Sequence, residues 1–362
     1  MIICTNCRRP YPDQGVPYKC PACGGVYDDP DGPILDPSQV DNSLHVIWRY
    51  RHTFGLPSSA PLVWLGEGDT PLVWSEAFGR QVAFKMEYLN PTGSFKDRGT
   101  APIISFLKSR GVDRAVEDSS GNAGASFAAY SARAGIKASV YVPASASGPK
   151  RKQIEAYGAQ VISIPGTRSN AEQAVRQAAE DGSVYASHAW LPFNLAGYAT
   201  LAYELVGQIG GVPGTVVCPV GQGGLLFGIS RGFRAMQKTG LIPRIPVLVG
   251  VQAMACAPLW ALSRYGLEGL GWVTEGETLA EGVRVRNPLR GDAVLQAVES
   301  CGGFFTAVEE QAILAGRDQL ALRGLYVEPT SAIVWNALAQ LGESVQQPIA
   351  VILTGSGFKT GR

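Results

Sequence analysis

The sequence predicts an α/β protein of two three-layer α/β/α domains with mainly parallel sheets, preceded by a small N-terminal metal-binding module. A chain of 362 residues suits two packed units that each bury a core. Between residues 112 and 187, short apolar runs alternate with helical stretches, which is typical of a parallel sheet with crossover helices. Two Cys-x-x-Cys pairs near the N-terminus indicate the third component, a metal-stabilised module.

The module is predicted from Cys4, Cys7, Cys20 and Cys23. Paired knuckles of this kind place four thiolates around one tetrahedral ion, which is the structural zinc arrangement. Two disulfides are the competing interpretation, and an iron site is another that this spacing allows. We expect zinc to supply most of the folding free energy of this small segment.

Composition points to small-molecule partners. Apolar residues make up 46% of the chain and charged residues 17%, and the formal net charge is +1. That charge provides no general field for holding nucleic acid or an anionic membrane, so neither is expected as a partner. The N-terminus lacks the features of a signal peptide, and no apolar run reaches the length of a membrane helix, so a cytoplasmic location is expected.

The expected sheets are defined by apolar runs with strand character. In the middle of the chain these runs lie at 115–116, 138–142, 160–164 and 184–186. Two further runs of the buried type lie at 215–220 and 349–353. Continuous apolar character in short runs is typical of strands covered on both faces.

A lysine stands at a predicted helix start. Residues 82–89 have strand character, Pro91 and Gly93 favour a tight turn, and Thr92 or Ser94 is expected to cap the next helix. Lys96 then lies in the opening turn, where the positive end of the helix dipole favours the neutral amine. A neutral lysine can form a covalent bond with an aldehyde. The alternative interpretation is a solvated lysine paired with Asp97.

Two further strand ends carry polar or glycine-rich loops. The segment 118–124 reads Asp-Ser-Ser-Gly-Asn-Ala-Gly and offers hydroxyl, amide and helix N-terminal donors to an anion, although a well-capped helix would look similar. The segment 221–225 reads Gly-Gln-Gly-Gly-Leu and predicts a phosphate cradle. A dinucleotide fingerprint requires a third glycine at position 226, which is Leu226, and no Walker-type lysine follows.

These motifs resemble those of the fold-type II pyridoxal-phosphate (PLP) enzymes, and segment 90–99 is similar to the lysine motif of the threonine synthase group in particular. The resemblance extends over most of the chain after about residue 60. It implies a tryptophan synthase β-like fold and an amino-acid substrate. Family analogy also implies a homodimer.

The resemblance assigns roles residue by residue. Lys96 would carry the cofactor covalently and remove the substrate α-proton, and Thr354, at the end of the last strand, would hydrogen-bond the pyridine nitrogen. Asn122 would contact the cofactor ring. The substrate carboxylate would be surrounded by Ser119, Ser120, Asn122 and Ala123. The cofactor phosphate would lie in the loop of Gly221, Gln222, Gly223, Gly224 and Leu225.

The predicted domain division has three parts. Residues 1–30 form the zinc-ribbon-like module, residues 31–97 and 191–362 the large PLP-binding domain, and residues 98–190 the small α/β domain.

Three functions remain open from the sequence. The first is a threonine synthase-like lyase that converts O-phosphohomoserine and water to threonine and phosphate. The second is an ammonia-lyase or β-replacement enzyme acting on serine, threonine, diaminopropionate or phosphoserine. It is favoured by the dehydratase-like glycine loop and by His188 and Ala189, which stand where threonine synthases carry asparagine and serine. The third is a non-catalytic PLP- or zinc-dependent interaction protein.

Overall fold

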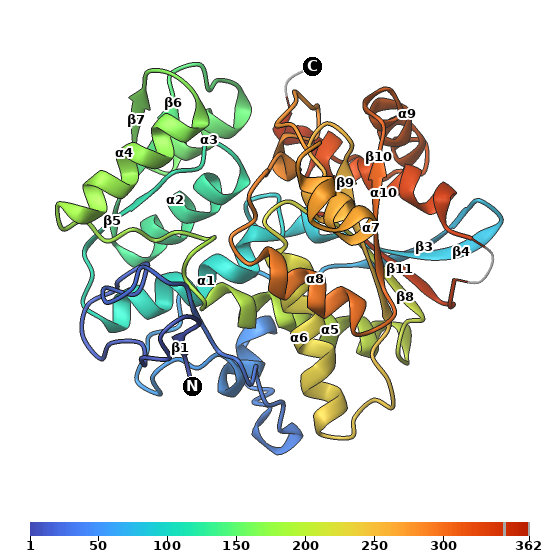
Figure 1. Cartoon of the computed structure of the whole chain (residues 1–362). Coiled ribbons are helices and arrows are strands. Elements are labelled where there is room, and N and C mark those ends of the chain that lie inside the picture. Colours follow the sequence, from blue (N-terminus) through green and yellow to red (C-terminus); the bar gives the residue numbers. More distant parts are fainter. Residues whose placement is uncertain (343–344, 361–362) are drawn as a thin grey trace. The chain divides into compact units, whose positions relative to one another are not determined.

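The computed structural model describes residues 1–342 and 345–360 and divides the chain into two compact units (Figure 1). Unit 1 contains Met1–Gly68 and Asn90–Gly197, and unit 2 contains Asp69–Leu89 and Tyr198–Lys359. Helix α5 (Asn194–Ile209) begins in unit 1 and continues into unit 2. The predicted division at residues 30, 97 and 190 stays a prediction.

Unit 1 contains the predicted alternation of strands and helices. Its elements in chain order are β1 (Ile3–Cys4), β2 (Tyr27–Asp28), η1 (Pro37–Gln39), η2 (Val46–Thr53), α1 (Lys96–Ser109), β5 (Arg114–Glu117), α2 (Asn122–Ala134), β6 (Lys137–Pro143), α3 (Pro149–Ala156), β7 (Gln160–Ile164) and α4 (Arg168–Glu180). Strands β5, β6 and β7 form a parallel sheet in that order, which confirms three of the predicted runs. The fourth run, 184–186, contributes only a parallel bridge between Tyr185 and Val116.

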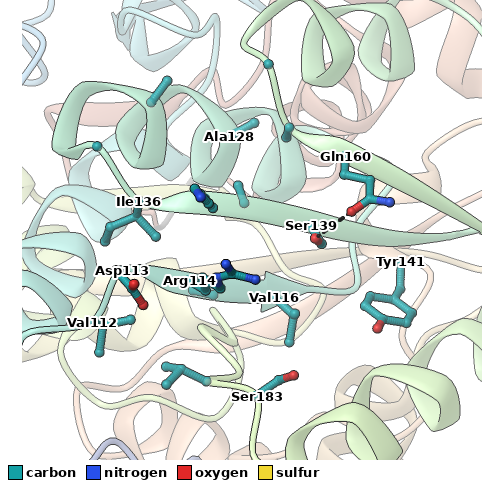
Figure 2. A pocket seen from close by; sticks show the side chains of 18 of the residues that line it. Val112, Asp113, Arg114, Val116, Ala128, Ile136, Ser139, Tyr141, Gln160 and Ser183 are labelled. Carbon is teal, nitrogen blue, oxygen red and sulfur yellow. Dashed lines mark hydrogen bonds between the residues drawn. The ribbon is translucent and has the colours of Figure 1, made fainter.

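A cavity of about 960 Å³ lies at the amino ends of these strands (Figure 2). Its lining includes Arg114, Lys137 and Gln160, which are the first residues of β5, β6 and β7. Ligands of open α/β sheets bind at the opposite edge, where the strands end. The cavity is therefore separate from the loops predicted to bind a ligand.

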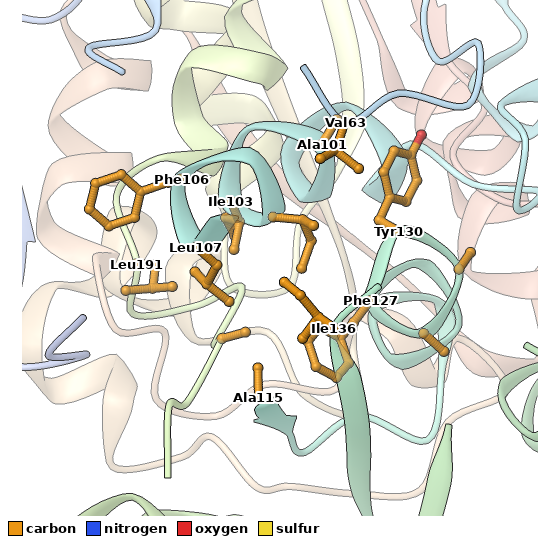
Figure 3. Packing of buried hydrophobic residues seen from close by; sticks show 14 of the residues in the cluster. Val63, Ala101, Ile103, Phe106, Leu107, Ala115, Phe127, Tyr130, Ile136 and Leu191 are labelled. Atoms are coloured by element: carbon orange, nitrogen blue, oxygen red, sulfur yellow. The ribbon is translucent and has the colours of Figure 1, made fainter. Parts of the chain in front are cut away.

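The core of unit 1 lies between α1, α2 and the sheet (Figure 3). Ile103 and Leu107 of α1 pack with Phe127 of α2 and Ala115 of β5, and all four are buried. Burying each large side chain contributes roughly 1.5–3 kcal/mol relative to exposure. This core therefore holds α1 and α2 in place, together with the turns where they begin. These two helix starts carry Lys96 and Asn122.

Unit 2 contains the larger sheet. Its elements in chain order are β3 (Leu72–Ala77), β4 (Arg80–Lys85), η3 (Glu87–Leu89), β8 (Thr215–Pro219), α6 (Gly224–Lys238), β9 (Val247–Ala253), α7 (Pro258–Leu270), η4 (Glu281–Val283), α8 (Gly291–Glu299), β10 (Phe304–Val308), α9 (Glu310–Ala321), α10 (Pro329–Gln340), β11 (Ile349–Ile352) and η5 (Gly357–Lys359). The strand order is β10-β9-β8-β11-β4-β3, and among the described strand pairs of this sheet only β3–β4 is antiparallel.

Strand β4 is shorter than predicted. It ends at Lys85, and Glu87–Leu89 form a 3-10 turn instead of continuing the strand. The buried Glu87 carboxylate accepts a 2.6 Å hydrogen bond from the Thr70 hydroxyl, which holds the chain in this turn.

Among the described residues, no helix is both long and apolar enough to span a membrane.

Candidate active site

Lys96 is the first residue of α1, as predicted, but the predicted caps are not used. The helix is preceded by Phe95, and no side chain accepts a hydrogen bond at that position. Instead, the buried Asp97 carboxylate accepts bonds from the Thr92 backbone N–H at 2.7 Å and from the Thr92 hydroxyl at 2.6 Å. The Asp97 carboxylate satisfies two donors of the turn, whereas a hydroxyl cap would satisfy one. This explains why Asp97, and not Thr92 or Ser94, is the acceptor at the start of α1.

Asp97 also joins the lysine turn to the neighbouring helix. The Ser126 hydroxyl of α2 lies 2.6 Å from Asp97 Oδ1 and 2.8 Å from the Thr100 hydroxyl. All three side chains are buried. This network ties the start of α1 to α2 and engages the Asp97 carboxylate with Thr92 and Ser126.

The β5–α2 loop contains the predicted carboxylate-binding residues. Ser119 is buried, and its hydroxyl accepts the Gly121 N–H at 3.2 Å. Asn122 and Ala123 open helix α2, where backbone N–H groups have no partner within the helix. A Cβ atom on Gly124 would lie 1.8 Å from the Ser119 carbonyl oxygen, so only glycine permits this tight first turn. The loop is therefore shaped to present donors to an anion.

Beside this loop lies a buried pair that the sequence did not single out as a site. Glu117 is the last residue of β5, and its Oε1 is 2.5 Å from Nδ1 of His188. Burial raises the pKa of Glu117 well above its usual range, and burial lowers the pKa of His188 well below its usual range. The Lys96 charge acts on both groups, so the lysine lies in their electrostatic neighbourhood. No local sequence signal joins the two residues, which are 71 positions apart in the chain.

In unit 2, the predicted phosphate loop leads directly into helix α6. The helix begins at Gly224, so the loop ends on unpaired N–H groups at the positive end of the helix dipole. Gly223 has φ +80°, and a Cβ atom there would lie 2.6 Å from the Val294 side chain. The Gln222 side chain accepts the Leu289 N–H at 2.9 Å. Because this bond engages the side chain, the backbone of Gln222 is the part of the residue left for a ligand.

Thr354 follows β11, the strand next to β8. Because the two strands are parallel, Thr354 and the loop at 221–225 lie at the same edge of the sheet. The Thr354 backbone N–H donates to the Ser331 hydroxyl at 2.9 Å. Its own Oγ1 is buried and has no hydrogen-bond partner among residues 1–342 and 345–360. A buried hydroxyl without a partner is destabilising, and this oxygen is able to bond to a ligand.

The four N-terminal cysteines converge as predicted. Their Sγ atoms all lie within 4.8 Å of one another, and the Cys4–Cys23 and Cys7–Cys20 separations are 3.5 and 3.6 Å. A disulfide bond requires about 2.05 Å, so both pairs are thiols. Four sulfurs at about 2.3 Å from one tetrahedral zinc would be roughly 3.8 Å apart, close to the observed spacing.

Each of the two α/β units thus carries a loop with donors suited to an anion at the carboxyl edge of its sheet, as in enzymes of this fold class. Residues 63–355 match the family of pyridoxal-phosphate dependent enzymes. The threonine synthase of Methanocaldococcus jannaschii is 32% identical over 98% of this chain and 92% of its own length. The threonine synthase of Synechocystis is 34% identical over 90% of this chain and 86% of its own. Among solved structures, a threonine deaminase from T.th. is 28% identical, with a TM-score of 0.69, and the match covers 81% of this chain and 94% of the deaminase.

The chain belongs to the pyridoxal-phosphate dependent enzyme family and is a PLP-dependent, threonine synthase-like lyase. The predicted fold type II architecture is confirmed by the family match and by the solved relatives. The predicted enzyme class is confirmed as well, which sets aside the non-catalytic alternative.

Proposed function

We propose that this enzyme converts O-phosphohomoserine and water to threonine and phosphate. The observation that carries the proposal is the likeness to threonine synthases along almost the whole chain, including the N-terminal part before the family match begins. Amino-acid substrates are the expected partners of such an enzyme.

The residues present fit the cofactor. The unpartnered Thr354 hydroxyl suits a pyridine nitrogen, and the Gly223 backbone leaves the start of α6 open to a phosphate group. When bound, PLP supplies an electron sink that makes the α-hydrogen of an amino acid acidic. A hydroxyl does not require the pyridine nitrogen to remain protonated, which favours elimination and replacement over long-lived carbanion chemistry.

The chain's own residues would perform the remaining tasks. Lys96 Nζ would hold the cofactor covalently and, once the substrate amine has displaced it and released its amine, would accept the α-hydrogen as a proton. The substrate carboxylate would be bound by the hydroxyl, amide and backbone donors of Ser119, Ser120, Asn122 and Ala123. Asn122 would contact the cofactor ring as well, and the loop of Gly221, Gln222, Gly223, Gly224 and Leu225 would hold the phosphate. Asp97 would keep Lys96 in place by fixing the turn before it.

We further propose that the four cysteines hold a structural zinc ion, because their spacing suits one tetrahedral metal. The module packs on the rest of unit 1 through aromatic contacts. Tyr11 lies 5.4 Å from Phe193, and Tyr18 lies 5.1 Å from Tyr185 and 5.4 Å from Trp190, measured between ring centroids. Zinc would thus support the segment 185–193. We propose a cytoplasmic location and, by family analogy, a homodimer; light scattering would test the oligomeric state.

A second candidate is an ammonia-lyase or β-replacement reaction on serine, threonine, diaminopropionate or phosphoserine. It is favoured by the likeness to the threonine deaminase structure. It is also favoured by His188, which follows the 184–186 segment and stands where threonine synthases carry asparagine. A panel of amino acids separates the candidates. Threonine and phosphate from O-phosphohomoserine support the first, and a 2-oxo acid with ammonia from serine, threonine or diaminopropionate supports the second. No product from any of these amino acids, with PLP bound, would refute both.

A further inference from the structure

The Glu117–His188 pair lies at the edge of the unit 1 sheet where ligands bind. Glu117 ends β5, and the neighbouring segment is tied to β5 by the hydrogen bond from Ala186 N to Val116 O at 2.9 Å. His188 follows two residues after Ala186, so both side chains emerge at the carboxyl edge of the sheet. Open α/β sheets bind their ligands at this edge. The same edge leads into the Ser119–Ala123 loop.

The contacts of the pair leave two buried acceptors without partners. Glu117 is 1% exposed, and its Oε2 makes no hydrogen bond within the described part of the chain. Asn194 Nδ2 donates to the His188 carbonyl at 2.5 Å, while the buried Asn194 Oδ1 is likewise unpartnered there. Each such atom is destabilising unless a water or ligand satisfies it. A ligand or water at this edge of the sheet would supply the missing donors.

The protonation state of the pair follows from its surroundings. Burial is the main cause of the raised pKa of Glu117, and the charge of Asp118 acts in the same direction, while Lys96 and Arg168 oppose it. Burial also dominates the lowered pKa of His188, and the positive charges of Lys96 and Arg168 lower it further. The shared proton therefore resides on Glu117, which donates it to Nδ1. The neutral imidazole then carries its hydrogen on Nε2.

Glu117 engages Nδ1 of His188 and leaves Nε2 as the other ring nitrogen. The His188 side chain is 14% exposed, and its Nε2 makes no hydrogen bond to the described residues. We propose that His188 is a catalytic residue of this lyase that donates an Nε2–H hydrogen bond to the side-chain oxygen of the amino-acid substrate, and that Glu117 is the positioning residue that fixes its tautomer. This inference rests on the proposed function. A neutral donor of this kind recognises a hydroxyl, ester or phosphate oxygen without adding charge to the site.

The tautomer can be read without measuring activity. The chain has three histidines, so nitrogen NMR of ¹⁵N-histidine-labelled, cofactor-free protein resolves His188 once it is assigned with H188L. We expect Nδ1 without hydrogen, Nε2 with hydrogen, and a ring that stays neutral at pH values where an ordinary histidine is protonated. E117Q keeps this tautomer because its amide N–H donates to Nδ1, whereas E117L loses it. An Nδ1–H tautomer or an imidazolium in the wild-type protein would overturn the inference.

Kinetics separate this role from general damage to the site. In H188L with PLP bound, exchange of the substrate α-hydrogen with solvent should continue, while kcat for product formation falls roughly 10- to 100-fold. H45N is the matched control, since His45 is exposed and stacks on Trp64 instead. Product formation by H188L at the wild-type rate, or loss of α-hydrogen exchange together with product, would overturn the inference. A wild-type enzyme that exchanges the α-hydrogen of no amino acid would instead refute the proposed function.

Discussion

Glu67 makes the stability of unit 1 depend on pH. Its side chain is 1% exposed, and Oε2 accepts bonds from the Tyr130 hydroxyl at 2.6 Å and the Leu65 N–H at 2.9 Å. Oε1 accepts from Trp48 Nε1 at 3.1 Å. Burial raises the pKa of Glu67 from 4.5 to about 7, assisted by the charge of Asp97 and opposed by the hydrogen bonds from Leu65 and Tyr130.

The sign of the effect follows from proton binding. Between pH 4.5 and about 7 the folded protein binds more protons at Glu67 than the unfolded chain does, so the free energy of unfolding falls as pH rises. At roughly 1.4 kcal/mol per pH unit, the full loss is about 3 kcal/mol. Most of it, about 2 to 3 kcal/mol, should appear between about pH 5 and about pH 8. The lowered pKa of His188 acts in the opposite direction on the stability. The effect of Glu67 is therefore read from the difference in stability between the wild type and a Glu67 variant.

The assay is urea unfolding of wild type and E67Q at both pH values. E67Q removes the titration, so the wild-type stability relative to E67Q should fall by about 2 to 3 kcal/mol from the lower to the higher pH. E155Q, which changes an exposed glutamate of α3, is the control and should parallel the wild type. A wild-type curve that also parallels E67Q would refute the reasoning.

Three further predictions concern the cofactor and the metal. T354V should weaken PLP binding, and equal PLP affinity of the variant and wild type by fluorescence titration would contradict this. The cofactor-free variant should be equally stable or up to about 1 kcal/mol more stable, because the substitution removes an unpartnered buried hydroxyl. G223A should weaken PLP binding through the +80° backbone angle and the clash with Val294, and unchanged affinity would refute the phosphate assignment. Chelation should release one zinc per chain and increase hydrogen exchange around Tyr185, which packs on Tyr18 of the module; protein without zinc as purified would refute the metal assignment.

The sequence predicted the parts of the fold that depend on local pattern. Continuous apolar runs predicted β5, β6, β7, β8 and β11, and the glycine-rich loop predicted the start of α6. The cap of α1 could not be predicted, because the acceptor is a carboxylate inside the helix that bonds backward to Thr92. Strand β4 ends early because of a contact between Glu87 and Thr70, which are 17 residues apart. Such tertiary contacts override local strand preference.

The candidate site shows the same limit. Lys96, Thr354 and the cysteines could be found because each lies in a short motif with chemical meaning. The Glu117–His188 pair could not, because its members are 71 residues apart and meet only when β5 and the 184–186 segment lie side by side. Burial, which sets their protonation, is also a property of the folded chain.

The most direct test of the account is the attachment site of the cofactor. Purified protein loaded with PLP should absorb visible light, and borohydride reduction followed by peptide mapping should place the pyridoxyl group on Lys96, with no visible band in K96A. A colourless protein after incubation with PLP, or a label on any other lysine, would contradict the account.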